Sequence, residues 1–350
     1  MIDASNLTKW LLGDAMKLDL AAAVESLALR LTALGLKIDR FSISFGLLSP
    51  SLLAAGVVWR PETGLEFTRF DYANRDMGTY ERSPFKVVHE SQKSLHLEID
   101  STPDDLYGVV PDLRASGIKH YHVFPLPTAD GSLMATTLST RSAEDFSEEQ
   151  LALLREIVPA LAAMAQVRTL HATFRDVLAA YVGKGPARQI IDGTVHRGEV
   201  TKVRAAILVA DLRAFTYLST QLPADATAEV INRYYDVVVP PVTERGGEIL
   251  KFIGDAVLAT FPVEEKGDEA AVLTALDAGR AMLATDVEPY RSQGREFPIR
   301  FGVAIHLGDA VFGNVGSGDR LDFTVIGRDV NVAARLAALC SRLGENYLVS

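Results

Sequence analysis

Residues 248–261, EILKFIGDAVLATF, decide how the C-terminal half of the chain folds. Two short apolar segments flank the dipeptide Gly254-Asp255, and this pattern is typical of a β-hairpin with a tight turn. The hairpin places the carboxylate of Asp255 at its tip. Glycine followed by aspartate is also common in turns that only shape the backbone, so this turn alone does not define a site.

A second carboxylate ends an apolar strand upstream. Residues 205–219, AAILVADLRAFTYLS, open with an apolar run that is typical of a buried strand, and the run ends on Asp211. A charge at the end of a buried strand costs free energy unless a cation or a helix N-terminus compensates it. Both alternatives are open for Asp211 by itself. Two carboxylates at strand ends, Asp211 and Asp255, suit Mg²⁺, which prefers hard oxygen ligands.

The segments around these aspartates resemble the catalytic domain of class III adenylate/guanylate cyclases. The resemblance extends from about Arg204 to the C-terminus. It rests on four motifs in the family's order and spacing: ADLRAFTYLS (210–219), KFIGDAVLA (251–259), FGVAIHLGDAVFGNVGS (301–317) and DFTVIGRDVNVAARL (322–336). Each motif alone is weak, and the four together are specific. The resemblance implies an α/β (α+β) domain with a ferredoxin-like βαββαβ core and additions.

The resemblance implies roles for matching residues. Asp211 and Asp255 match the metal-binding aspartates, which in the family hold two divalent ions per site, Mg²⁺ or Mn²⁺, for in-line phosphoryl transfer. Lys251 and Thr324 match the two residues that recognise the purine. Adenylate cyclases carry Asp or Thr at the second position, and guanylate cyclases usually carry Glu and Cys at the two positions, so this pair resembles that of adenylate cyclases. The chemistry agrees, because a lysine donates to N1 of adenine, whereas N1 of guanine carries a hydrogen.

Asn331 and Arg335 match the family's transition-state pair. Their spacing of four places them on one helix face, where one can orient the ribose while the other meets charge on the reacting phosphate. In the family, the metal aspartates come from one subunit, and the purine readers and the Asn/Arg pair come from the other. This chain carries both sets, so the resemblance implies a head-to-tail homodimer with two equivalent sites.

Two features depart from the family pattern. Ala214 stands beside the metal aspartate where the family often has glycine, in a loop that passes close to phosphate. The sequence ends at Ser350, whereas the family's domains usually continue through another strand with a basic residue for the terminal phosphates. Arg320 is a weaker candidate for that phosphate contact. The general base is not identified by the sequence.

The N-terminal part has the layout of a sensor domain. A helical pattern covers residues 19–36. Strand patterns follow at residues 41–48, 54–60, 65–70, 121–127 and 132–140. Residues 145–182 predict a long helix with a capping box at Ser147 and Gln150, and Pro159 is expected to kink or divide it. This order resembles a GAF domain, whose expected signal here is an unknown small-molecule ligand.

Two features of this part have alternative interpretations. The histidines His89, His96, His120 and His122 are either ligands of a metal ion or haem, or surface and hydrogen-bonded structural residues. The long helix joins the two halves of the chain. It either pairs with its copy in a dimer and carries a twist or shift between domains, or it is a plain spacer.

Length and composition set further limits. The 350 residues suit a sensor domain at residues 1–145, a helical linker at 146–198 and a catalytic domain at 199–350. A net charge of −10 argues against a nucleic-acid partner, and the single cysteine, Cys340, excludes an intramolecular disulfide. The sequence shows no signal-peptide pattern and no run of about 18 apolar residues. We therefore expect a cytoplasmic protein without a membrane partner.

These observations predict an adenylate cyclase. It would convert ATP to 3′,5′-cyclic AMP and pyrophosphate by a two-metal mechanism at a homodimer interface, under the control of the N-terminal domain. Two alternatives are a guanylate cyclase, which Lys251 and Thr324 disfavour, and a non-catalytic cyclase homologue that binds nucleotide or a partner and regulates another process.

Overall fold

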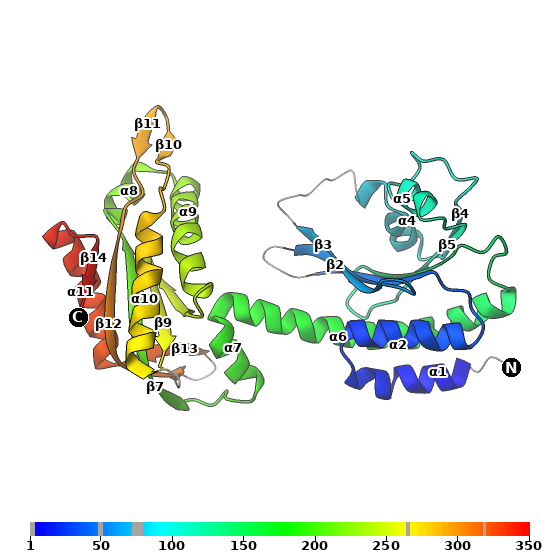
Figure 1. Ribbon diagram of the computed structural model, residues 1–350, viewed down its shortest axis with the longest axis horizontal. Helices are drawn as coiled ribbons and strands as arrows, with labels where there is room; N and C mark the ends of the chain where they lie inside the picture. Colours follow the sequence, from blue (N-terminus) through cyan, green and yellow to red (C-terminus); the bar gives the residue numbers. More distant parts are fainter. Residues whose placement is uncertain (1–3, 48–51, 72–79, 264–266, 318–319) are drawn as a thin grey trace. The chain divides into compact units, whose positions relative to one another are not determined.

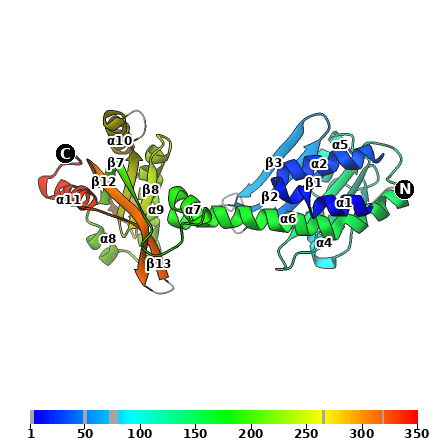
Figure 2. The same cartoon turned by 90° about the horizontal axis from the view of Figure 1, so that it is seen from below.

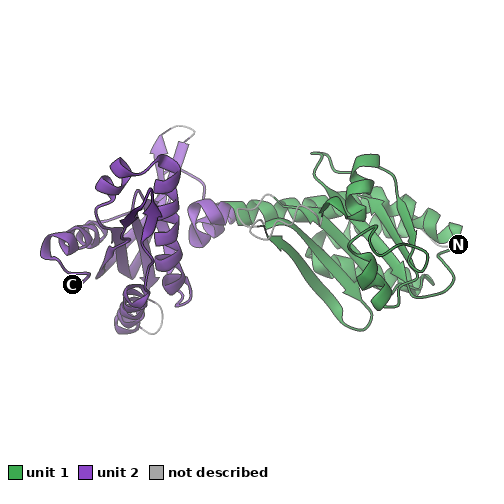
Figure 3. Ribbon diagram, turned by 90° about the horizontal axis from the view of Figure 1, so that it is seen from above, with its two compact units in different colours: residues 1–177 green, residues 178–350 purple. Residues whose placement is uncertain are grey.

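The chain divides into two compact units. The computed structural model describes residues 4–47, 52–71, 80–263, 267–317 and 320–350. The units are Met1–Val177 and Leu178–Ser350 (Figure 3), and their boundary lies within the segment predicted as a linker. Each unit encloses hydrophobic cores of its own, so each is described by itself.

A six-stranded antiparallel sheet organises the N-terminal unit, in the order β3-β2-β1-β6-β5-β4. The strands are β1 (Arg40–Gly46), β2 (Leu52–Arg60), β3 (Gly64–Asp71), β4 (Leu95–Glu98), β5 (His120–Pro125) and β6 (Met134–Thr140). The predicted strand at 41–48 ends earlier, at Gly46, and its last residue lies outside the described part.

Helices cover both faces of this sheet. The short 3-10 helix η1 (Asp14–Lys17) follows α1 (Ala4–Leu11). Helices α1, α2 (Leu20–Ala33) and α6 (Glu148–Val182) pack on one face, and α4 (Pro84–Ser91) and α5 (Val110–Ala115) on the other (Figures 1 and 2). The predicted layout of a helix, several strands and a long closing helix is confirmed.

Helix α6 begins with the predicted capping box. The Ser147 N–H donates to Gln150 Oε1 at 3.0 Å, and the Gln150 N–H donates to Ser147 Oγ at 3.3 Å. Pro159 lies inside α6 and does not divide it, contrary to that part of the prediction. Proline removes one backbone hydrogen bond, and the burial of neighbours such as Ile157 and Leu161 in the core holds the helix together.

Helix α6 is also long and apolar enough, by length and composition, to cross a membrane. Half of its most apolar window is buried inside the structure. Apolar side chains of its first turns, from Leu151 to Ala165, form part of the core of the N-terminal unit. Buried apolar side chains of this kind are what the core helix of a folded unit shows.

The C-terminal unit is built on a sheet in the order β13-β12-β7-β9-β8, with β14 paired to β12. Its elements are α7 (Lys184–Ile191), β7 (Val200–Leu212), α8 (Phe215–Gln221), α9 (Ala224–Thr243), β8 (Glu248–Ile253), β9 (Ala256–Pro262), α10 (Gly267–Ala284), β10 (Tyr290–Ser292), β11 (Arg295–Phe297), β12 (Phe301–Ser317), β13 (Arg320–Ile326), α11 (Arg328–Leu343) and β14 (Tyr347–Val349). The series β7-α9-β8-β9-α10-β12 is the predicted βαββαβ core, and the predicted fold class is confirmed.

The two faces of this sheet have separate apolar cores. Ala206, Leu208 and Ala210 of β7 pack with α9 and α10. Ile207 and Val209 pack with α11 on the opposite face. Because side chains alternate along a strand, Asp211 belongs to the α11 side of β7.

The side chains of α11 that face the sheet are small. Ala333, Ala337 and Cys340 are buried there, and Cys340 is 1% exposed. Its Sγ donates to the carbonyl oxygen of Val303 on β12 at 3.7 Å. The opposite face of α11 is exposed.

Candidate active site

Two aspartates meet at one end of the C-terminal sheet. Asp211 is the penultimate residue of β7, opposite Ala256 on β9 and Gly302 on β12. Asp255 precedes Ala256 in the turn between β8 and β9, as the sequence predicts. The Leu212 N–H donates to the Asp255 carbonyl oxygen at 3.2 Å, so the strand end that carries Asp211 is fastened to the turn that carries Asp255.

The alternative role of Asp211 as a helix cap is excluded. The next helix, α8, has Ala214 at its N-cap position, without a side-chain cap. Ala214 has a φ of 57°, in the left-handed region that glycine adopts at little cost. This backbone conformation gives a physical reason for the glycine that the family often has at this position.

The electrostatics of the aspartate pair favour a cation. Burial, with a further contribution from the negative charge of Asp255, raises the pKa of Asp211 to about 6. Burial also raises the pKa of Asp255. Within the described ranges, neither carboxylate forms an ion pair with a lysine, arginine or histidine. Two partly buried carboxylates without a counter-charge are stabilised by a divalent ion with oxygen ligands.

Two tyrosines on α9 support the pair, and the sequence analysis did not identify them. The Tyr235 hydroxyl donates to the Gly254 carbonyl oxygen at 2.8 Å, which ties the turn before Asp255 to α9. Burial and the charge of Asp211 raise the pKa of Tyr234, whose buried hydroxyl has no hydrogen-bond partner in the described part of the chain. Adjacent tyrosines in an amphipathic helix predict only core packing, so no sequence signal marked them.

Lys251 lies on β8, four residues before Asp255, and its Nζ forms an ion pair with Asp322 on β13. Thr324 lies two residues after Asp322, so both side chains belong to the same face of β13. The ion pair therefore brings together β8 and β13, the strands that carry the two predicted purine readers, although these strands lie at opposite ends of the sheet order. The sequence analysis did not single out Asp322, which pairs with the predicted purine reader Lys251. Its place two residues before Thr324, in the motif DFTVIG, was the only signal for it.

Asn331 and Arg335 lie one turn apart on α11, and both side chains are exposed. No hydrogen bond or ion pair joins either one to Asp211 or Asp255 among the residues that the structure describes. Arg320, the weaker candidate for a phosphate contact, is exposed at the start of β13. The predicted residues thus form three groups within one chain: the aspartate pair, the Lys251–Thr324 region and the exposed face of α11.

Comparison with known proteins assigns a domain family to the C-terminal unit. Residues 199–343 match the family model of the adenylate and guanylate cyclase catalytic domain. The C-terminal unit carries a class III nucleotide cyclase catalytic domain. This cyclase domain is similar to an adenylate cyclase of Anabaena cylindrica, with 33% identity over 158 residues, which is 45% of this chain and 31% of the relative. The chain thus spans about a third of that relative.

Solved structures show similarity to both units. The adenylyl cyclase CyaB from P. aeruginosa is 31% identical, with 40% of this chain and 74% of that chain covered and a TM-score of 0.35. A GAF domain of a two-component sensor histidine kinase from Bacillus halodurans is 15% identical, with coverage of 43% and 97% and a TM-score of 0.34.

Proposed function

We propose that this chain is an adenylate cyclase that converts ATP to 3′,5′-cyclic AMP and pyrophosphate, regulated by its N-terminal unit. The observation that carries the proposal is the partly buried pair of Asp211 and Asp255 beside β8, the strand that also carries Lys251. In the reaction, the ribose 3′-oxygen forms a bond to the α-phosphorus, the bond from that phosphorus to the bridging oxygen breaks, and the 3′-hydroxyl loses its proton.

The aspartate pair fits two divalent ions, Mg²⁺ or Mn²⁺. Its donors are carboxylate oxygens, and the pKa of each carboxyl is raised. When bound, such ions supply positive charge to the triphosphate and lower the pKa of the attacking hydroxyl. Asp211 and Asp255 would hold them, and Tyr235 would keep the turn of Asp255 in place.

Lys251 and Thr324 support ATP as the substrate. The Lys251 ammonium can donate to adenine N1, and the Thr324 hydroxyl can accept from the adenine amino group. The ion pair with Asp322 limits the positions that the flexible lysine side chain samples. A guanine base would present a hydrogen at N1 to the same ammonium, which leaves two donors facing each other.

The exposed face of α11 supports a site that is shared between two chains. Asn331 and Arg335 project from this face and can orient the ribose and stabilise charge on the α-phosphate. Because both side chains are unpaired among the described residues, they are free to complete the site of a second copy. A head-to-tail homodimer would then contain two equivalent sites.

Product analysis with ATP and with GTP in Mn²⁺ distinguishes the candidate functions. We expect cyclic AMP from ATP, no product after Asp255→Ala, and little change after Asp236→Ala, which alters an exposed aspartate of α9. Cyclic GMP as the main product would identify a guanylate cyclase. Nucleotide binding without product would identify a non-catalytic regulator. Full activity of Asp255→Ala would contradict the metal role.

Complementation tests the shared site. Asp211→Ala and Asn331→Ala are each expected to be inactive alone. Mixed subunits regain part of the activity, because one site of the heterodimer is composed of unaltered residues. If subunit exchange is demonstrated and activity does not return, the two groups of residues act within one chain and the proposed dimer arrangement is wrong.

A further inference from the structure

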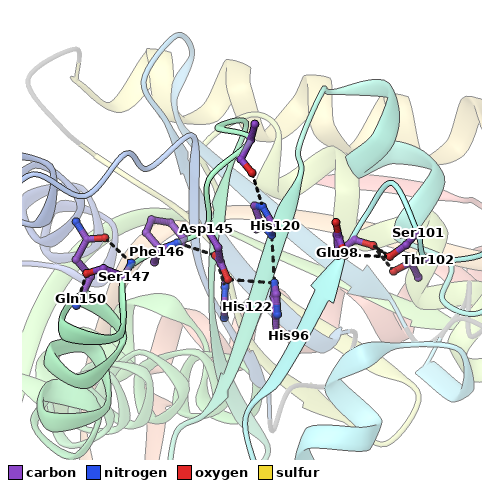
Figure 4. Close-up of polar contacts among 11 residues, drawn as sticks. His96, Glu98, Ser101, Thr102, His120, His122, Asp145, Phe146, Ser147 and Gln150 are labelled. Atoms are coloured by element: carbon purple, nitrogen blue, oxygen red, sulfur yellow. Dashed lines mark hydrogen bonds and ion pairs between the residues drawn. The ribbon is translucent and has the colours of Figure 1, made fainter.

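The N-terminal unit holds a cluster of metal-ligand side chains at the edge of its sheet. His96 lies on β4, His120 on β5, and Asp145 in the segment between β6 and α6 (Figure 4). One ligand atom from each residue lies within 4.8 Å of the others. The sheet register creates the cluster, because His96 faces His122 across the strands and His120 is two residues before His122, on the same face.

The distances in the cluster match those of a tetrahedral metal site. His96 Nε2 lies 3.3 Å from His120 Nδ1 and 3.4 Å from Asp145 Oδ2. Zinc bonds of about 2.0–2.1 Å in a tetrahedron place neighbouring ligand atoms about 3.3 Å apart. The three atoms therefore already have the spacing that two edges of a zinc tetrahedron require.

The hydrogen bonds around the cluster orient its lone pairs inward. His120 Nε2 lies 3.3 Å from the Ala143 carbonyl oxygen and donates to it, which leaves a lone pair on Nδ1. His122 Nε2 and the Phe146 N–H donate to Asp145 Oδ1 at 2.8 and 2.7 Å, which leaves Oδ2 directed towards His96. Ligand histidines and carboxylates in metal sites are typically held by such outer hydrogen bonds.

His122 supports the cluster without being a ligand. It is 5% exposed, and its Nε2 donates to Asp145 Oδ1 at 2.8 Å, so it holds this carboxylate in place. Its ring stacks on that of His96, with centroids 4.2 Å apart and an interplanar angle of 8°. His96 itself has a side chain that is 42% exposed, so an ion has access from solvent.

We propose that His96, His120 and Asp145 bind one divalent transition-metal ion of the zinc type, with water as the fourth ligand. Two imidazoles and one carboxylate suit zinc and its neighbours in the periodic table rather than Mg²⁺, which prefers oxygen ligands alone. This site is separate from the aspartate pair of the cyclase domain and does not depend on the proposed activity.

The position of Asp145 gives the site a structural consequence. Asp145 precedes Ser147 by two residues, and Ser147 forms the capping box that begins α6. A bound ion would therefore fasten β4 and β5 to the start of α6. Metal binding would stabilise this end of the N-terminal unit against local opening, because the ligands are brought together only in the folded state.

Cobalt and zinc titrations of the full chain test the proposal. The untagged protein carries Asp255→Asn, which weakens competing binding at the aspartate pair. We expect one Zn²⁺ per chain by calorimetry and the visible absorption of tetrahedral Co²⁺. His96→Gln and His120→Gln should each lose at least about 100-fold in affinity, because even outer-shell changes cost about 10–100-fold. His171→Gln, at an exposed histidine on α6, is the matched control.

Two results would overturn the site. One is the absence of stoichiometric Zn²⁺ binding and of a tetrahedral Co²⁺ spectrum in the parent protein. The other is unchanged affinity in both His96→Gln and His120→Gln, which would show that the cluster is only a hydrogen-bonded part of the sheet edge. Circular dichroism and melting of each variant in EDTA establish that the fold is retained, and the exposed position of His96 makes His96→Gln the variant least able to disturb it.

Discussion

Replacing Asp211 by asparagine is expected to stabilise the metal-free cyclase domain at neutral pH. In the folded chain, burial and the charge of Asp255 raise the pKa of Asp211 to about 6, from an ordinary value of 3.8. Above pH 6 the carboxylate is ionised in both the folded and the unfolded state, and only the folded state keeps that charge desolvated beside a second one. The unaltered protein therefore loses stability as the pH rises from about 4 to 6.

The size of this effect follows from the pKa difference. A shift from 3.8 to about 6 is about 2 units, and each unit corresponds to about 1.36 kcal/mol. The full value of about 3 kcal/mol must be reduced because Asp211 is only half-buried and water screens its charge. We expect Asp211→Asn to raise the free energy of unfolding by about 1–2 kcal/mol at pH 7–8. Below about pH 4, where Asp211 is protonated in both states, the gain should vanish.

Calorimetric melting in EDTA between pH 4 and pH 8 measures this effect. For a unit of this size, the gain corresponds to a rise in melting temperature of about 3–6 °C. Both tryptophans, Trp10 and Trp59, lie in the N-terminal unit, so the transition followed by tryptophan fluorescence should shift little. Asp236→Asn, at an exposed position on α9, should change stability by less than about 0.5 kcal/mol.

A pH-independent gain in Asp211→Asn, or no gain at pH 8, would refute the electrostatic argument. Mn²⁺ provides a second comparison, because binding to the folded state raises its stability. Added Mn²⁺ should raise the melting temperature of the unaltered cyclase domain clearly and that of Asp211→Asn only slightly. An equal rise in both proteins would show that the ion binds elsewhere.

Three further substitutions test individual contacts. Tyr235→Phe removes the hydrogen bond to Gly254, worth about 1 kcal/mol, and should lower the cyclase rate several-fold. An unchanged rate and an unchanged Mn²⁺ requirement would show that this hydrogen bond does not position the turn. Asp322→Asn removes the ion pair of Lys251 and should reduce the preference for ATP over GTP in initial-rate assays. The free energy of unfolding should change by less than about 1 kcal/mol, because the pair is partly exposed. An unchanged preference for ATP would count against base recognition by this lysine. Ser147→Ala breaks the capping box of α6 and should lower the free energy of unfolding by about 1 kcal/mol. Tryptophan fluorescence in urea measures this change. An unchanged midpoint of the urea transition would mean that the cap does not contribute to stability.

The cyclase domain was predictable because its determinants are local. The β8–β9 hairpin follows from two apolar segments around Gly254-Asp255, and the strand that ends at Asp211 follows from an unbroken apolar run. Both aspartates therefore come to strand ends in any fold that pairs these strands. The motif spacing supplied the rest of the arrangement, including the helix that carries Asn331 and Arg335.

The parts that could not be predicted depend on contacts between distant residues. The ion pair of Lys251 with Asp322 joins strands at opposite ends of the sheet order, and no local pattern indicates it. The histidine cluster requires the register of β4 against β5 together with the path of the chain from β6 to Asp145. Pro159 shows the reverse case, because its local preference for breaking a helix was outweighed by tertiary packing.

The buried thiol beneath α11 offers a built-in reporter. Cys340 is the only cysteine of the chain, and burial raises its pKa, so it stays protonated and sheltered while α11 is docked. A thiol reagent can modify Cys340 only while α11 is transiently separated from β12. The rate of modification therefore measures the free energy of that opening. The helix with Asn331 and Arg335 can thus be followed in solution without an introduced label.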